Sequence, residues 1–139
     1  MLTRRFEARL ADAPALTGFV EAQVLSLDRD TALKLRLMLE ELFVNTVSHG
    51  HGGDCDAPVD VTIDVGAEDV AVTYVDSAPP FDPFSAVQEP DAEDSIDARP
   101  VGRLGVFLVT RLADRYEYAC VDGRNRVKLH LRLQRPLTS

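Results

Sequence analysis

Cysteine is scarce in this sequence, and long apolar runs are missing from it. The two cysteines, Cys55 and Cys120, are too few for a mini-domain built on disulfides, and we expect a loop thiol and a half-buried strand residue respectively. No stretch approaches the ~18 consecutive apolar residues of a membrane span. Arg4 and Arg5 are not followed by the long apolar run of a secretion signal. We therefore expect a cytoplasmic protein with no membrane partner.

Basic residues are also in deficit. The chain has 15 Lys and Arg against 23 Asp and Glu, which gives a formal net charge of −8. Binding to nucleic acid or to an anionic membrane needs clustered positive charge, so this balance argues against both partners. It is compatible with a protein partner, or with a phosphate ligand held alongside a metal ion.

The usual nucleotide and hydrolase signatures are absent as well. The sequence has no Walker A pattern, no complete dinucleotide fingerprint and no Gly-x-Ser-x-Gly. It also shows no internal repeat at the periods typical of solenoids. What it does contain is enough for one globular domain over residues 1–139, because 45% of the residues are apolar and 27% are charged.

Hydrophobic periodicity predicts the elements of the first half. Alternation favours an opening strand over residues 2–10, with its apolar side chains on one side, and apolar residues three and four apart favour a helix over 15–27. Asp28 or Asp30 is a suitable N-cap for a second helix that runs to about Ser48.

The second half predicts two hairpins separated by a loop and a helix. Alternation favours strands over 58–65 and 70–76, and helical periodicity returns over 102–114. Asp122-Gly123 is a strong turn signal for the closing hairpin. Because strands and helices are grouped, we expect an α+β fold, a two-layer sandwich with a mixed, mostly antiparallel sheet and helices on one face.

The stretch between residues 77 and 98 differs from the rest. It holds four prolines and six acidic residues but no Lys or Arg. This composition predicts a loop or lid, with a short helical turn around Phe84 to Val87. Loops of this length inside compact domains tend to be functional.

The second predicted helix carries a polar sector between two apolar faces. Glu41, Asn45 and Ser48 share this sector when the helix is wound at about 100° per residue. A carboxylate and an amide in such a position are not easily left dry and unpaired. Two interpretations stay open: solvated side chains at the helix edge, or the lining of a polar pocket.

Three blocks of the sequence resemble the boxes of one ATPase superfamily. Glu41 to Asn45, followed by His49-Gly50, resembles the N-box of the GHKL ATPases; Asp76 to Pro83 resembles the first glycine box, and Val101 to Val109 the second. The blocks arrive in the family's order, and the resemblance covers nearly the whole chain. Within this superfamily the sequence is similar to the anti-sigma-factor serine/threonine kinases.

The resemblance implies a role for several of these residues. Asn45 would give its side-chain oxygen to Mg²⁺, which prefers hard oxygen ligands. Glu41, four residues earlier on the same helix face, would be the general base that deprotonates an acceptor serine or threonine. His49 belongs to the N-box and to the nucleotide-binding residues, and Asp76 would accept a hydrogen bond from the adenine amino group of ATP or ADP. From the pattern alone, a solvated strand end or a turn cap is the favoured interpretation of Asp76, and the resemblance reverses this preference.

The second glycine box would bind phosphates, and both glycine boxes depart from the family pattern. Gly102 and Gly105 lie at the start of the third predicted helix, where backbone N–H groups bind anions. Ala78 stands where the family has glycine, which is costly if the position needs a positive φ or a close approach to adenine. Arg103 follows Gly102 in place of a further glycine; it is suited to bind phosphate as a fork donor, or else to obstruct the site.

Two functions follow from these observations. The first is an anti-sigma factor that holds a sigma factor inactive and phosphorylates a STAS-type anti-anti-sigma protein, as a Mg²⁺-dependent serine/threonine kinase. The alternative, motivated by Ala78 and Arg103, is a partner-switching binding module of the same fold with weak or no catalysis. The resemblance also implies a homodimer, with the first strand and helix as the candidate interface.

Overall fold

The computed structural model describes residues 1–84 and 103–133, and the side chains of 103–107 are not part of that description. Its centre is one five-stranded sheet in the order β1-β2-β3-β5-β4, in which every neighbouring pair is antiparallel. The strands are β1 (Leu2–Glu7), β2 (Pro58–Val65), β3 (Asp69–Asp76), β4 (Arg115–Val121) and β5 (Arg124–Arg132).

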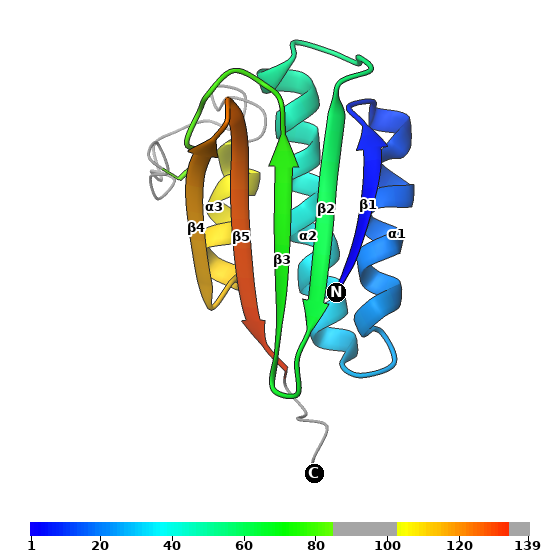
Figure 1. Cartoon of the computed structure of the whole chain (residues 1–139). Coiled ribbons are helices and arrows are strands. Elements are labelled where there is room, and N and C mark those ends of the chain that lie inside the picture. The colour runs from blue at the N-terminus through cyan, green and yellow to red at the C-terminus, as the bar shows by residue number, and fades with distance from the viewer. Residues whose placement is uncertain (85–102, 134–139) are drawn as a thin grey trace.

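In the described ranges three α-helices cover one face of this sheet and none covers the other face (Figure 1). They are α1 (Ala13–Val24), α2 (Arg29–Asn45) and α3 (Arg103–Leu112), with a short 3-10 turn η1 (Leu10–Asp12) before α1 and a π-helical segment η2 (Thr46–Gly50) after α2. The predicted α+β sandwich with helices on one face is therefore confirmed. None of the helices in the described ranges is long and apolar enough to cross a bilayer.

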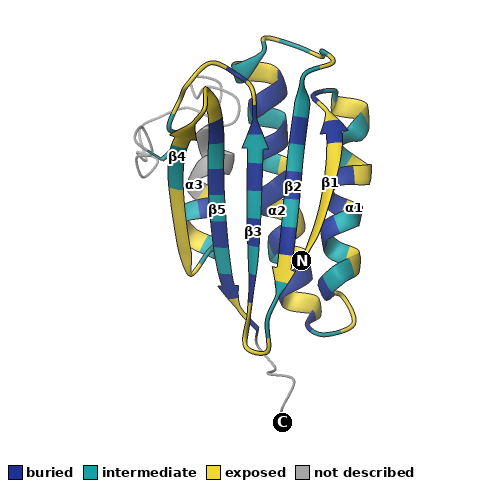
Figure 2. Cartoon of the chain, in the orientation of Figure 1, coloured by how far each residue is buried: buried dark blue, intermediate teal, exposed yellow. Residues whose placement is uncertain are grey.

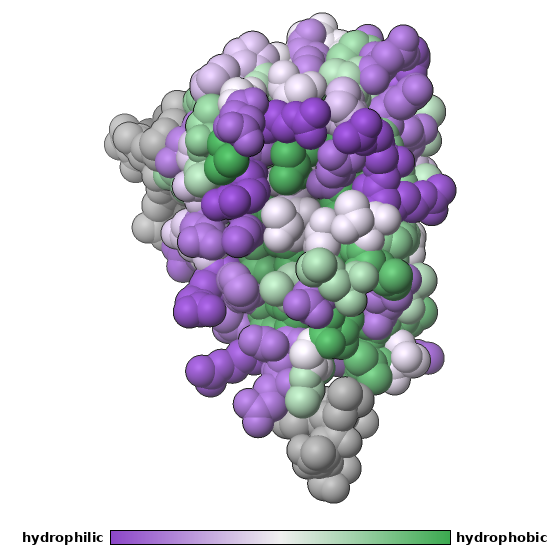
Figure 3. Space-filling view, viewed as in Figure 1, coloured by the Kyte–Doolittle hydropathy of each residue, from purple (hydrophilic) through white to green (hydrophobic). Residues whose placement is uncertain are grey.

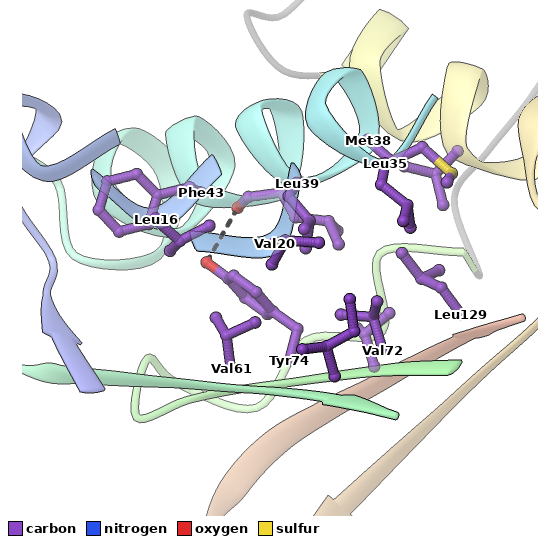
Figure 4. Packing of buried hydrophobic residues seen from close by; sticks show 14 of the residues in the cluster. Leu16, Val20, Leu35, Met38, Leu39, Phe43, Val61, Val72, Tyr74 and Leu129 are labelled. Carbon is purple, nitrogen blue, oxygen red and sulfur yellow. Dashed lines mark hydrogen bonds between the residues drawn. The ribbon is translucent and has the colours of Figure 1, made fainter. Parts of the chain in front are cut away.

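The core lies between the two layers. Strand residues alternate between buried and partly exposed along β2, β3 and β5, as Figure 2 shows. Their inward side chains meet the buried face of α2, where Leu35, Met38, Leu39 and Phe43 pack as seen in Figure 4. This burial of apolar area is the main favourable contribution to folding.

Local signals explain where several elements begin and turn. The Asp28 side chain accepts from the backbone N–H groups of Asp30 and Thr31, so Asp28 rather than Asp30 is the N-cap of α2. Asp122 and Gly123 have φ values of 52° and 75°, which is the backbone of a two-residue hairpin turn between β4 and β5.

Some expected boundaries and faces were wrong. The opening strand ends at Glu7 rather than near residue 10, because the chain then turns into η1, and Leu2 and Leu10 are 50% and 47% exposed rather than part of one apolar face. The helix expected to reach residue 27 ends at Val24. Cys120 is exposed rather than half-buried, since it lies near the end of the edge strand β4.

Of the predicted loop, residues 77–84 are described and the remainder is not. Within this part the Phe84 backbone N–H donates to Asp82 Oδ1 at 2.8 Å. Most of the helical turn predicted around residues 84–87 lies outside the described residues.

Candidate functional site

The predicted motif residues gather at one end of the sandwich. The carboxyl end of α2, the carboxyl end of β3 and the amino end of α3 lie there together (Figure 1). Strand register supports this placement, because Asp76 pairs with Asn125 at the start of β5, whereas the segment after α3 bonds to His130 near the other end of β5. The three resembling blocks, far apart in sequence, thus approach one another.

Glu41 and Asn45 occupy the last turns of α2, and both are half-buried. Burial raises the pKa of the Glu41 carboxyl, and the neighbouring charge of Glu40 raises it further. A raised pKa makes a carboxylate a stronger proton acceptor. Ser48, the third member of the predicted polar sector, is exposed, so the sector passes from half-buried to solvated along the helix edge.

Asp76 is buried at the end of β3, where three hydrogen bonds hold its carboxylate. Oδ2 accepts from the Thr46 hydroxyl at 2.8 Å, and Oδ1 accepts from the Ala78 backbone N–H at 3.1 Å and from Asn125 Nδ2 at 2.9 Å. The alternative of a solvated strand-end aspartate is therefore wrong, since only 8% of Asp76 is exposed. The bond to Ala78 does give Asp76 the geometry of a turn cap as well.

Tyr74 supports the Asp76 carboxylate indirectly, through a hydrogen bond to Thr46. Its side chain points from β3 towards α2 (Figure 4), and its hydroxyl lies 2.6 Å from Thr46 Oγ1 and donates to the Leu42 carbonyl at 3.4 Å. Burial raises the pKa of the Tyr74 hydroxyl well above its usual value. The phenol stays neutral, so it orients Thr46 as a hydrogen-bond partner and not as a charge.

Asn125 connects this carboxylate to the segment after β3. Besides its bond to Asp76, Nδ2 donates to the carbonyls of Ala78 and Pro79 at 3.1 and 3.2 Å. Its Oδ1 accepts from the Phe81 backbone N–H at 3.1 Å and from the Tyr118 hydroxyl at 2.5 Å. One buried amide therefore sets the path of residues 78–81 relative to the sheet.

Ala78 is accommodated here by a glycine. A Cβ added to Gly50 would lie 2.7 Å from the Ala78 Cβ, closer than real Cβ contacts. Among the described non-glycine residues, Asp122 alone has a positive φ, so the backbone of Ala78 carries no left-handed strain. The methyl group that departs from the family pattern thus fills space that Gly50 leaves open.

Three of the remaining predicted residues lie in η2 or at the start of α3. His49 lies in η2 and is exposed. Arg103 and Gly105 are the first and third residues of α3, as expected for a helix N-terminus, whereas Gly102 lies outside the described residues. His51, which follows η2, has a buried Nε2 with no hydrogen-bond partner in the described part of the chain.

Sequence reasoning gave no role to Thr46, Tyr74 or Asn125. Each does leave a signal, because each is a polar residue at a position where periodicity places apolar ones. Asn125 begins the inward series of β5, before Val127 and Leu129, and Tyr74 precedes Asp76 at the end of the inward series of β3. Such polar residues inside a core need partners, and here they partner one another.

The residues present suit an adenine nucleotide with Mg²⁺. Oδ2 of Asp76 accepts one hydrogen bond within the described residues, from Thr46, and a carboxylate oxygen has room for a second donor such as an exocyclic amine. Asn45 offers a hard oxygen of the kind that Mg²⁺ takes from proteins. Asn45 would hold the metal, and the metal with its nucleotide would supply charge neutralisation for phosphoryl transfer.

Comparison with known proteins agrees with this geometry. No curated protein matches the chain. The family model for the histidine kinase-like ATPase domain matches residues 6–131, from β1 to β5, and so includes every helix and strand that contributes to the site. The chain therefore belongs to the histidine kinase-like ATPase domain family.

Proposed function

We propose that this chain is a Mg²⁺- and ATP-dependent serine/threonine protein kinase that acts as an anti-sigma factor. Its partners would be a sigma factor, which it holds inactive, and a STAS-type anti-anti-sigma protein, which it phosphorylates. The observation that carries the proposal is the half-buried pair Glu41 and Asn45, one turn apart on α2, at the same end of the fold as Asp76.

In the proposed reaction, the hydroxyl oxygen of the acceptor serine or threonine bonds to the γ-phosphorus of ATP, and ADP leaves. Glu41 accepts the proton of that hydroxyl. The raised pKa of Glu41 favours this role. Asn45 holds Mg²⁺, and Asp76 recognises the adenine amino group through Oδ2. The first turn of α3, with Arg103 and Gly105, would face the phosphates.

The test begins with nucleotide binding. Calorimetric titration with ATP and ADP should give binding that depends on Mg²⁺ and that weakens in Asn45→Ala, with Ser48→Ala as the exposed control one turn away. Phosphate transfer to a STAS-type protein from the same genome should then be measured with labelled ATP. Intact ATP binding with no transfer to any candidate would remove the kinase half of the proposal.

A second candidate function is a partner-switching binding module without catalysis. The three donors that already hold Asp76 favour it, because they occupy much of the carboxylate that adenine would approach. A protein that gives no heat and no thermal stabilisation with ATP, yet binds a sigma factor or its antagonist, would support this function over the kinase.

We also propose a homodimer formed through β1 and α1. β1 is an edge strand of the sheet, and Leu2 on it is 50% exposed. An edge strand with an exposed apolar side chain is a template for pairing. Sedimentation velocity should show a dimer for the natural chain and a monomer for Leu2→Asp; a natural chain that sediments as a monomer at micromolar concentration would overturn this part.

A further inference from the structure

The open face of the sheet carries a row of basic residues along β5. Inward positions of this strand are buried, and the alternate outward positions are Arg124, Arg126, Lys128, His130 and Arg132, here called the basic stripe. Four of the 15 Lys and Arg in a chain of net charge −8 therefore lie on one side of one strand. Figure 3 shows this face, with hydrophilic residues gathered over β4 and β5.

The stripe forms one ion pair within the described ranges, and acidic residues lie opposite Lys128 and Arg132 in strand register. Arg124 lies 3.6 Å from Asp60 on β2, which Arg5 already binds through two hydrogen bonds. The side chains of Arg126, Lys128 and Arg132 form no ion pair with any residue of the described ranges. Like charges at alternate strand positions stand about 7 Å apart and repel one another. A row of this kind is stabilised when an anion binds along it.

The neighbours of the stripe differ between its two sides. In strand register, Arg126 lies between Val75 and Ala119, and Lys128 has Thr73 beside it on β3. Small side chains on β3 leave room for another chain to lie alongside β5. On the other side Glu117 of β4 faces Lys128, which limits the positive surface to about one strand in width.

We propose that the basic stripe is a docking surface for an acidic protein segment in extended conformation. Alternate side chains of an extended chain point the same way, with a spacing of about 7 Å that equals the spacing of the stripe. A carboxylate at every second position would then face one basic residue each. This inference concerns the open face of the sheet and does not depend on the nucleotide site or on kinase activity.

Acidic protein fits this surface better than nucleic acid does. A nucleic-acid duplex carries charge over a width greater than one strand, and its phosphates would meet Asp60 and Asp64 on the outward side of β2 or Glu117 on β4. The net charge of −8 would also repel it at long range. A narrow acidic segment meets the same long-range repulsion but keeps clear of these carboxylates.

The test uses the full chain and a labelled peptide of about ten residues in which glutamate alternates with threonine. Fluorescence anisotropy should show binding that weakens as salt rises from about 50 to 300 mM. Arg126→Gln combined with Lys128→Gln should weaken it by about tenfold. The matched control, Arg29→Gln combined with Arg36→Gln, removes the same charge from exposed positions of α2 and should change it less than about twofold.

Three results would overturn the proposal: no binding of the peptide, an equal loss in the control variant, or tighter binding of a single-stranded oligothymidine of similar length. If the β5 variant fails to fold, amide chemical shifts of the natural chain decide the question. Titration with the peptide should move resonances along β5 and β3 and leave those of α1 and α2 unchanged. Shifts confined to the helices would contradict the assignment of the surface.

Discussion

Gly50 and Ala78 are packed so closely that a Cβ added to Gly50 would lie 2.7 Å from the Ala78 Cβ. Gly50 ends the π-helical segment after α2, and Ala78 follows β3 by two residues. This contact joins the N-box to the first glycine box. It also explains how the chain tolerates alanine at position 78, because Gly50 has no Cβ and leaves room for the Ala78 methyl group.

Gly50→Ala should therefore destabilise the protein by about 1–3 kcal/mol, since neither methyl group has a flexible side chain through which to move away. Combining it with Ala78→Gly should recover most of the loss. Urea unfolding of the single and double variants measures this coupling. Gly18→Ala, in α1 with no atom within 4 Å of the added Cβ, is the control and should be neutral or stabilising. A double variant no more stable than Gly50→Ala would contradict the contact.

Thr46→Val should cost about 1–3 kcal/mol of unfolding free energy, although the two side chains have nearly the same shape. The substitution removes the hydroxyl that donates to Asp76 Oδ2 and lies 2.6 Å from the Tyr74 hydroxyl, so two buried polar groups lose a partner. Thr73→Val, on the outward side of β3, is the matched control and should change stability by less than about 0.5 kcal/mol. Equal effects of the two substitutions would show that the buried bonds contribute nothing.

Asn125→Asp should make stability depend on pH. The amide that donates to Asp76 at 2.9 Å becomes a second carboxyl, and two carboxylates at this distance are not both ionised without a large cost. The folded-state pKa of the pair then lies above the unfolded value of about 4. The stability that this pair contributes to the fold is fully present below that value and is lost as the pH rises through the raised pKa. Relative to the natural chain, Asn125→Ala should lose a similar amount of unfolding free energy at pH values of about 5 and 8. Asn125→Asp should lose more unfolding free energy at the higher pH than at the lower one.

The periodicity of the sequence located most elements because it depends on which side of a strand or helix is buried. Alternation placed β2 and β3 to within a residue, and the Asp122-Gly123 turn was found because few residues adopt a positive φ. The second of the two apolar faces predicted for this helix holds Leu33 and Leu37 of α2, and it is not buried. They are 43% and 39% exposed. The helices form a single layer, so the side of α2 that faces away from the sheet is left uncovered.

The motif residues were found by local pattern, whereas the residues that hold them depend on tertiary contact. Glu41 and Asn45 lie four apart on one helix, so their spacing alone places them together. The bonds from Thr46 and Asn125 to Asp76 join residues 30 and 49 positions apart. No local rule predicts such pairs, and the only warning in the sequence is a polar residue at an inward position.

Glu41→Gln should uncouple stability from activity. Burial and the charge of Glu40 raise the folded-state pKa of Glu41, so this carboxyl contributes stability below its unfolded value of about 4.3, and the contribution is lost as the pH rises through the raised pKa. Glutamine is neutral at every pH. The variant should therefore gain thermal stability over the natural chain as pH rises from about 4 to 7, while phosphate transfer falls by about a hundredfold or more and Mg²⁺-dependent ATP binding is kept.

Glu40→Gln, the exposed neighbour, is the control and should retain phosphate transfer. Transfer that survives in Glu41→Gln would mean that another group takes the proton.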